Sequence, residues 1–258
     1  MYKHFSLFGF IFLFVTYFSL LAQTPEMTAD AAKLYNEGNK LVKSGQYQGA
    51  LEKYDGALDI QKHPNIYYQK SVALKKLRNY TDAESALLAA VKIDSNFVTA
   101  YSGLGTTYYS LRRYNDAITN FQKYISLSDN EAQNDKIRKF IGLAFTSLGQ
   151  NAKSDGKYDV AVAHLNEAVK NYNYDAAYLY LAEIHVETGN YDLALEAADK
   201  AINFRTSKSK ISRGAPYYYK GLAFKGKSDT EKARENFLIA VKDSQYKGPS
   251  QYELDFMK

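Results

Sequence analysis

Histidine is the residue type in this chain best suited to acid–base catalysis or metal binding, and the four histidines stand far apart in the sequence. His164 and His185 fall in separate helical patterns, His63 precedes a proline, and no two histidines are one helical turn apart, as a zinc-binding pair would be. Because cysteine is absent, thiolate ligands, nucleophilic thiols and disulfides are excluded. We therefore expect no catalytic site, no metal and no cofactor, and we interpret His185 as a buried structural histidine.

The tyrosines are spaced regularly enough to indicate an internal sequence repeat. The 258 residues include 24 Tyr and no Trp, and a Tyr-x-x-Ala pattern recurs along the chain. The intervals between its alanines are 33, 34, 44, 33 and 39 residues, counting a weaker sixth copy that ends at Ala233. The other five alanines are Ala50, Ala83, Ala117, Ala161 and Ala194.

A small residue stands twelve positions before each of these alanines. A small residue on one helix and an alanine on the next let two antiparallel helices approach closely, so the pattern predicts tightly packed helix pairs. Glycines between the two patterns, at Gly45, Gly156 and Gly189, are predicted to end the first helix in a left-handed conformation. The small residues are Gly38, Ser71, Gly105, Gly149, Ala182 and Gly221.

These positions and intervals resemble the tetratricopeptide repeat family over about residues 31–247. The resemblance implies an all-α fold, a right-handed α-solenoid in which 23–258 form one superhelix of six helix pairs. It also implies that the recurrent tyrosines are mostly core and turn residues rather than a sugar-binding or base-stacking platform. The six repeats are expected near residues 31–63, 64–97, 98–131, 142–174, 175–208 and 214–247.

Two intervals exceed the usual repeat length, and each predicts an insertion. The polar residues 129–140 are expected to extend the first helix of the fourth pair as a solvated segment. The second insertion, 205–213, is a loop with four basic residues, which we interpret as solvent-exposed, with contact to an anionic lipid surface or an acidic partner as the alternative. The tail from Gly248 is expected either to fray or to cap the last pair.

In each of the first three repeats, helical periodicity and the resemblance predict that one face of the first helix does not contact the core. We expect a partner to bind on this face. It carries aromatic, amide and basic side chains, so the expected partner is a protein or peptide segment with acidic character. Further along the chain, Glu183 and Glu187 are expected on the same side, which suggests that the charge of the binding surface changes from positive to negative along its length. The predicted binding residues are Tyr35, Asn39, Lys43, Tyr68, Val72, Lys75, Lys76, Ser102, Thr106 and Tyr109.

One subclass of the family holds a terminal carboxylate of heat-shock chaperones in a clamp of lysine, asparagine and arginine side chains. Asn39 matches one position of that clamp. Without the clamp's other charges a free carboxylate would not be held bidentately, so we expect a different kind of partner. The positions that do not match hold Tyr35, Gln69, Thr99 and Gly103.

The first 22 residues read as a signal peptide, with a basic start, an apolar run at Phe5–Leu21 and a cleavage position after Ala22. Export to the periplasm or cell envelope is the expected location, with an uncleaved membrane anchor as the alternative. The net charge of +5 is too small and too evenly spread to favour nucleic acid.

A scaffold or adaptor, within a secretion or assembly machine of the envelope, is the favoured function. An exported solute- or glycan-binding protein and a self-assembling structural protein are the alternatives, and the oligomeric state is not fixed by the sequence. Saturable sugar binding would favour the first alternative, and concentration-dependent assembly the second.

Overall fold

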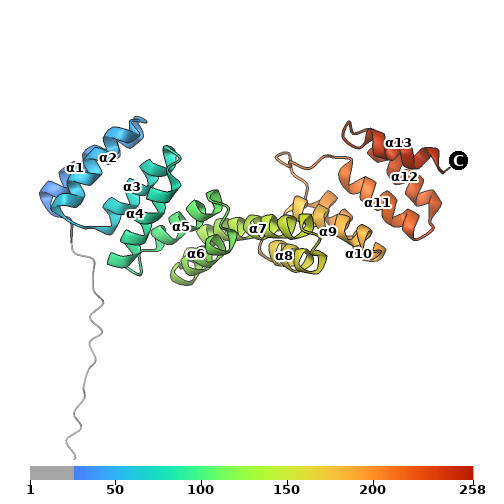
Figure 1. Cartoon of the computed structure of the whole chain (residues 1–258), viewed down its shortest axis with the longest axis horizontal. Coiled ribbons are helices and arrows are strands. Elements are labelled where there is room, and N and C mark those ends of the chain that lie inside the picture. The colour runs from blue at the N-terminus through green and yellow to red at the C-terminus, as the bar shows by residue number, and fades with distance from the viewer. Residues whose placement is uncertain (1–25, 258) are drawn as a thin grey trace, which may run out of the picture.

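The computed structural model describes residues 26–257, so the predicted signal peptide lies outside the described residues. Within them the chain forms thirteen α-helices and no strand, arranged along one long axis from α1 to α13 (Figure 1). The helices are α1 (Ala29–Lys43), α2 (Tyr47–Ile60), α3 (Pro64–Lys76), α4 (Tyr80–Ile93), α5 (Val98–Ser110), α6 (Tyr114–Leu127), α7 (Glu131–Ser154), α8 (Tyr158–Asn171), α9 (Asp175–Glu187), α10 (Tyr191–Asn203), α11 (Ala215–Gly226), α12 (Thr230–Ala240) and α13 (Lys247–Asp255).

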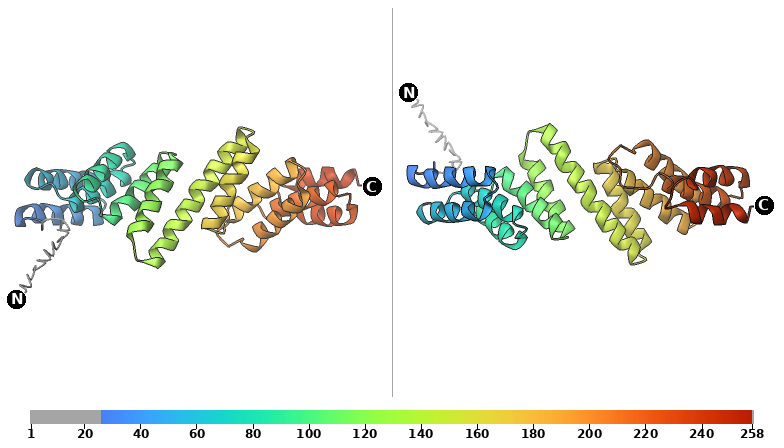
Figure 2. Two further views of the ribbon diagram at one scale, coloured as in Figure 1. Left: turned by 90° about the horizontal axis from the view of Figure 1, so that it is seen from below. Right: turned by 90° about the horizontal axis from the view of Figure 1, so that it is seen from above.

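Consecutive helices pack in antiparallel pairs, from α1 with α2 to α11 with α12. Each first helix also touches the first helix of the next pair, as α1 touches α3 and α3 touches α5. The pairs therefore stack in a row, with α7 and α8 crossing the middle of the molecule between the two ends (Figure 2). The predicted α-solenoid is confirmed.

The turns inside the pairs use a left-handed residue to end the first helix. Gly45, Gly156 and Gly189 have φ of 78°, 72° and 74°, as their positions in the sequence predicted. At the corresponding point of three other pairs stand Arg78, Arg112 and Ser228, with φ of 59°, 59° and 63°. The same turn thus forms without glycine, at a cost in backbone strain that the neighbouring helices must offset.

The small residue of the first helix faces a large side chain of the second. A Cβ atom added at Gly38 would lie 2.6 Å from Cε1 of Tyr54, and one added at Gly105 would lie 2.4 Å from Cε1 of Phe121. Gly149 faces Leu165 in the same way, at 2.6 Å from Cγ. The sequence identified the small residue correctly but not its partner, which stands one turn after the recurrent alanine.

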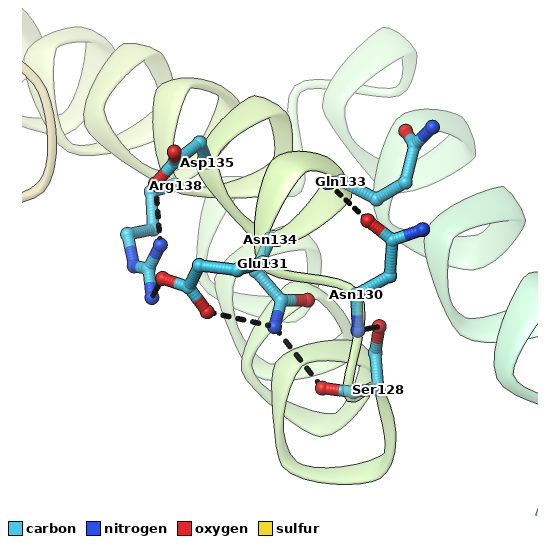
Figure 3. Close-up of polar contacts among 7 residues, drawn as sticks. All are labelled: Ser128, Asn130, Glu131, Gln133, Asn134, Asp135 and Arg138. Atoms are coloured by element: carbon cyan, nitrogen blue, oxygen red, sulfur yellow. Dashed lines mark hydrogen bonds and ion pairs between the residues drawn. The ribbon is translucent and has the colours of Figure 1, made fainter.

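Helix α7 is extended at its start, as the long interval predicted. Asn130 caps the helix by accepting a hydrogen bond from the N–H of Gln133 at 3.1 Å, and Arg138 pairs with Glu131 and Asp135, at 2.6 Å each (Figure 3). The extension is more than a solvated segment, because Ile137 is buried in the core beside Phe121.

The C-terminal tail forms α13 and covers the last pair. Leu254 packs against Phe237, and Glu253 forms an ion pair with Lys225 of α11. Of the two expectations for this segment, the cap is the one that the structure shows.

The contact between Gly105 and Phe121 gives a test of this packing. We expect Gly105→Ala to destabilise the protein by about 1–3 kcal/mol, because the added methyl group overpacks a fully buried ring. The matched control is Gly248→Ala in α13, where a Cβ atom would meet nothing within 4 Å. Alanine favours a helix over glycine, so the control should be neutral or slightly stabilising. Urea unfolding followed by circular dichroism measures both, and equal midpoints for the two variants would contradict the packing argument.

Candidate functional site

The ten predicted binding residues lie on α1, α3 and α5, the first helices of three successive pairs, and we call them the inner face. These helices touch one another directly, so their side chains form one surface rather than three. Tyr35, Asn39 and Lys43 come from α1; Tyr68, Val72, Lys75 and Lys76 from α3; Ser102, Thr106 and Tyr109 from α5.

Each of the three helices contributes one half-buried tyrosine to the inner face. The Tyr68 ring packs edge-on against Phe97, with 5.9 Å between ring centroids. Burial, with smaller effects of Tyr124 and Tyr35, raises the pKa of Tyr68. Tyr124, on α6, is therefore a neighbour of the inner face that is not among the ten predicted residues.

The other two tyrosines are supported in the same way. Tyr35 lies 6.2 Å from the Tyr54 ring, and Tyr109 lies 5.4 Å from the Tyr114 ring. All three inner-face rings are therefore held by an aromatic neighbour and are only partly exposed.

Several polar groups of the inner face are engaged within the protein. Asn39 Oδ1 accepts a hydrogen bond from the Tyr54 hydroxyl at 2.8 Å, which fixes the amide against α2. Lys75 Nζ donates to Thr106 Oγ1 at 2.5 Å and so joins α3 to α5. Burial, with a smaller effect of Lys76, lowers the pKa of Lys75. The Ser102 hydroxyl donates to the carbonyl of Thr99 at 2.9 Å, within its own helix.

The three inner-face lysines therefore differ. Lys43 and Lys76 are exposed, and neither forms an ion pair within the described residues. Lys75 is half-buried and bonded to its neighbour. The sequence treated the three as one basic cluster, whereas the structure leaves two of them free to meet an acidic partner.

Two positions that the carboxylate clamp would need lie on α5 and hold no basic side chain. A Cβ atom at Gly103 would lie 2.7 Å from Cδ2 of Leu87, so a larger residue there would require the Leu87 side chain to shift. The corresponding lysine position is the exposed Thr99. Without a guanidinium and an ammonium at these two positions, bidentate binding of a free carboxylate lacks its charged donors.

The acidic side chains predicted to change the sign of the surface charge towards α9 are partly offset by a lysine of the same protein. Lys153 Nζ, from α7, lies 2.9 Å from Glu183 and 3.6 Å from Glu187. Nearby, burial raises the pKa of Tyr219, and the charge of Glu183 adds to that shift. The single ammonium of Lys153 offsets one of the two carboxylate charges, so a net negative charge remains at this point.

A pocket of about 710 Å³ that the sequence did not indicate lies between α2, α3 and α4. Its floor is apolar, with Leu51, Leu74 and Ala86, and its rim carries Glu52 and Asp82. None of its lining residues belongs to the inner face. It arises from the gap between second helices of successive pairs, which a periodicity argument about single helices cannot locate.

His185 does not have the fully satisfied environment that the sequence suggested. It is half-buried beside a pocket of about 140 Å³ between α9 and α10, and its Nδ1 atom has no hydrogen-bond partner. Burial lowers the pKa of His185 below 6.5, and the charge of Glu196 opposes that shift. Within residues 26–257 no group of three or more acidic or histidine side chains is arranged to hold a metal ion.

A family model described as tetratricopeptide repeat matches residues 35–96, 68–132 and 146–210. Small glutamine-rich tetratricopeptide repeat-containing protein 2 of Mycosarcoma maydis is 28% identical over 131 residues, 50% of this chain and 36% of the relative. DnaJ homolog subfamily C member 7 of Homo sapiens is 30% identical over 92 residues, 34% of this chain and 19% of the relative. The chain thus spans about a third or less of the length of these two relatives.

Two solved structures share the fold. MamA of Desulfovibrio magneticus RS-1 has a TM-score of 0.51 at 17% identity and covers 71% of this chain and 99% of its own. YrrB, described as a TPR protein with an unusual peptide-binding site, also has a TM-score of 0.51, at 18% identity, and covers 78% of this chain and 96% of its own.

The expected periplasmic or cell-envelope location is wrong. The curated relatives reported for this chain come from fungi and vertebrates, whose cells have no bacterial periplasm. The expectation rested on residues 1–22, which lie outside the described part of the chain. Within that part, no helix is both long and apolar enough to cross a membrane.

The shifted pKa of His185 predicts how stability depends on pH. Because its pKa is lowered in the folded state, the unfolded chain binds more protons just below pH 6.5, so stability falls as the pH drops through that range. We expect the melting temperature to fall less between about pH 7.5 and 5.5 in His185→Gln than in the unmodified protein. The control is His164→Gln, at a histidine whose ring lies 6.1 Å from Phe145. An unchanged pH dependence in His185→Gln would show that another group is responsible.

Proposed function

Because the chain belongs to the tetratricopeptide repeat family, we propose that it is a protein–protein interaction scaffold that binds an extended or helical segment of a partner on the inner face. In a stack of helix pairs, each pair buries its faces against its neighbours, and the first helices line the concave side. The ten residues of the inner face come from the first helices of three successive pairs, which supports placing the binding surface on that side. Binding there would use side chains from α1, α3 and α5 together.

The observation that carries this proposal is the row of three supported tyrosines. Tyr35, Tyr68 and Tyr109 come one from each helix, and each packs on an aromatic neighbour that fixes its ring. A tyrosine offers a large apolar area with a polar hydroxyl and has few rotatable bonds. A ring that is already immobilised loses little entropy on binding, so these residues suit a binding surface for a peptide segment.

The charges of the inner face favour an acidic segment. Lys43 and Lys76 are exposed, and the ten inner-face residues include no carboxylate. A lysine ammonium is a compact charge on a flexible stem, so it attracts an acidic side chain without demanding a fixed geometry. The proposed partner is therefore recognised by acidic and apolar side chains within a segment and not by a clamped terminal carboxylate.

Charge reversal at the two exposed lysines tests the proposal. We expect Lys43→Glu with Lys76→Glu to weaken partner binding by about tenfold or more, because like charges brought together across an interface cost several kcal/mol. The partner would first be identified by cross-linking to the full chain in its native cells. Its affinity would then be measured by calorimetry with the purified proteins.

The matched control is Lys92→Glu with Lys123→Glu, which makes the same charge change at exposed residues on the second helices α4 and α6. This variant should bind within about twofold of the unmodified protein, since its changes lie away from the inner face. If the control loses as much affinity as the test variant, or if the test variant loses none, the binding surface is not the inner face.

A further inference from the structure

The loop between α10 and α11 forms a basic pocket on a surface separate from the inner face. Between Asn203 and Tyr219 the chain has four basic residues and no acidic one. Two of them, Arg205 and Arg213, stand at opposite ends of the loop and yet line the same pocket, which has a volume of about 330 Å³. The remaining lining residues are Ile202, Thr206, Ser207, Pro216 and Tyr217.

The loop is tied to the helices around it. The Ser209 hydroxyl donates a hydrogen bond to the buried carboxylate of Asp175 at the start of α9. The N–H of Gly214 donates to Asp243 at 3.0 Å. Within the loop, Arg205 Nη1 donates to the carbonyl of Ser212 at 3.3 Å, which closes the loop on itself. These contacts bring the two arginines to one place.

The positive charge of this pocket is not balanced by the protein itself. Within the described residues, the side chains of Arg205, Lys208, Lys210 and Arg213 form no ion pair. The nearest carboxylates that contact the loop, Asp175 and Asp243, accept bonds from Ser209 and Gly214 instead. No acidic residue lines the pocket.

We propose that this pocket binds a phosphorylated side chain of a partner peptide. A phosphoryl group carries a charge of about −1.5 to −2 and three acceptor oxygens. Two guanidinium groups supply a matching charge and rigid donor forks, and the hydroxyls of Thr206 and Ser207 are additional donors. A single carboxylate, with one charge and two oxygens, would satisfy only one of the two arginines.

The apolar wall of the pocket fits the stem of such a side chain. Ile202, Pro216 and Tyr217 line one part of a volume that exceeds what a free phosphate ion needs. A lipid surface is a poorer match, because the apolar side chains of the loop are held by the protein. Ile211 is half-buried, and the Phe204 ring, although 38% exposed, stacks on Tyr178 with 5.5 Å between centroids.

The test uses the full chain and calorimetry at about 0.15 M salt, so that weak surface attraction is screened. The probes are acetylated pentapeptides with a central phosphotyrosine or phosphoserine flanked by glycines, the same peptides without phosphate, and inorganic phosphate. We expect at least one phosphopeptide to bind about tenfold or more tightly than its unphosphorylated form and than inorganic phosphate. Arg205→Gln with Arg213→Gln should abolish that preference.

The matched control is Lys208→Gln with Lys210→Gln, which removes the same charge from the same loop at residues that do not line the pocket. It should weaken phosphopeptide binding by less than about threefold, as expected for exposed charges. Melting curves of both variants confirm that the loop change leaves the solenoid folded. The proposal is overturned if both double variants lose equal affinity, or if neither phosphopeptide shows the preference.

Discussion

The close approach of the two helices in each pair is the constraint on which the rest of the structure depends. At Gly38, Gly105 and Gly149 a first helix lies so near its partner that even a Cβ atom would overlap a side chain of the second helix. This distance sets how far each pair can slide along its neighbour and thus the register of the whole stack. The inner face exists because successive first helices touch, α1 with α3 and α3 with α5.

Much of this fold could be predicted from the sequence, because its determinants are local. The small residue, the recurrent alanine and the turn glycine each act within one pair, so their spacing alone predicts paired helices and a solenoid. The turns at Arg78 and Arg112 show where local signals fail. These residues adopt the left-handed conformation without being glycine, since tertiary packing over-determines the turn. The partner of Gly105 was missed because the pattern pairs each small residue with the recurrent alanine, whereas the ring that faces Gly105 is that of Phe121, one turn later.

Helical periodicity predicted a candidate site on the first helices, but it could not tell which of its side chains remain available for binding. Whether Lys75 is free depends on Thr106, thirty-one residues away on another helix, and Asn39 depends on Tyr54 in the same way. Both contacts follow from the register between helices, which no single-helix pattern contains. The pocket lined by Arg205 and Arg213 is still harder to predict from the sequence. It depends on the hydrogen bond between Ser209 and Asp175, which holds the loop in place.

The distribution of charge along the stack connects the two surfaces. Unpaired basic side chains occur at Lys43 and Lys76 near one end and in the α10–α11 loop near the other, whereas Lys153 is neutralised by Glu183 between them. Each pair contacts mainly its neighbours, so a change at one end does not alter the geometry of the other. The two surfaces can therefore be tested independently, with each serving as an internal reference for the folding of the other. A partner that engages both surfaces would have to be acidic at two separated points, because the unpaired basic side chains lie at the two ends of the stack.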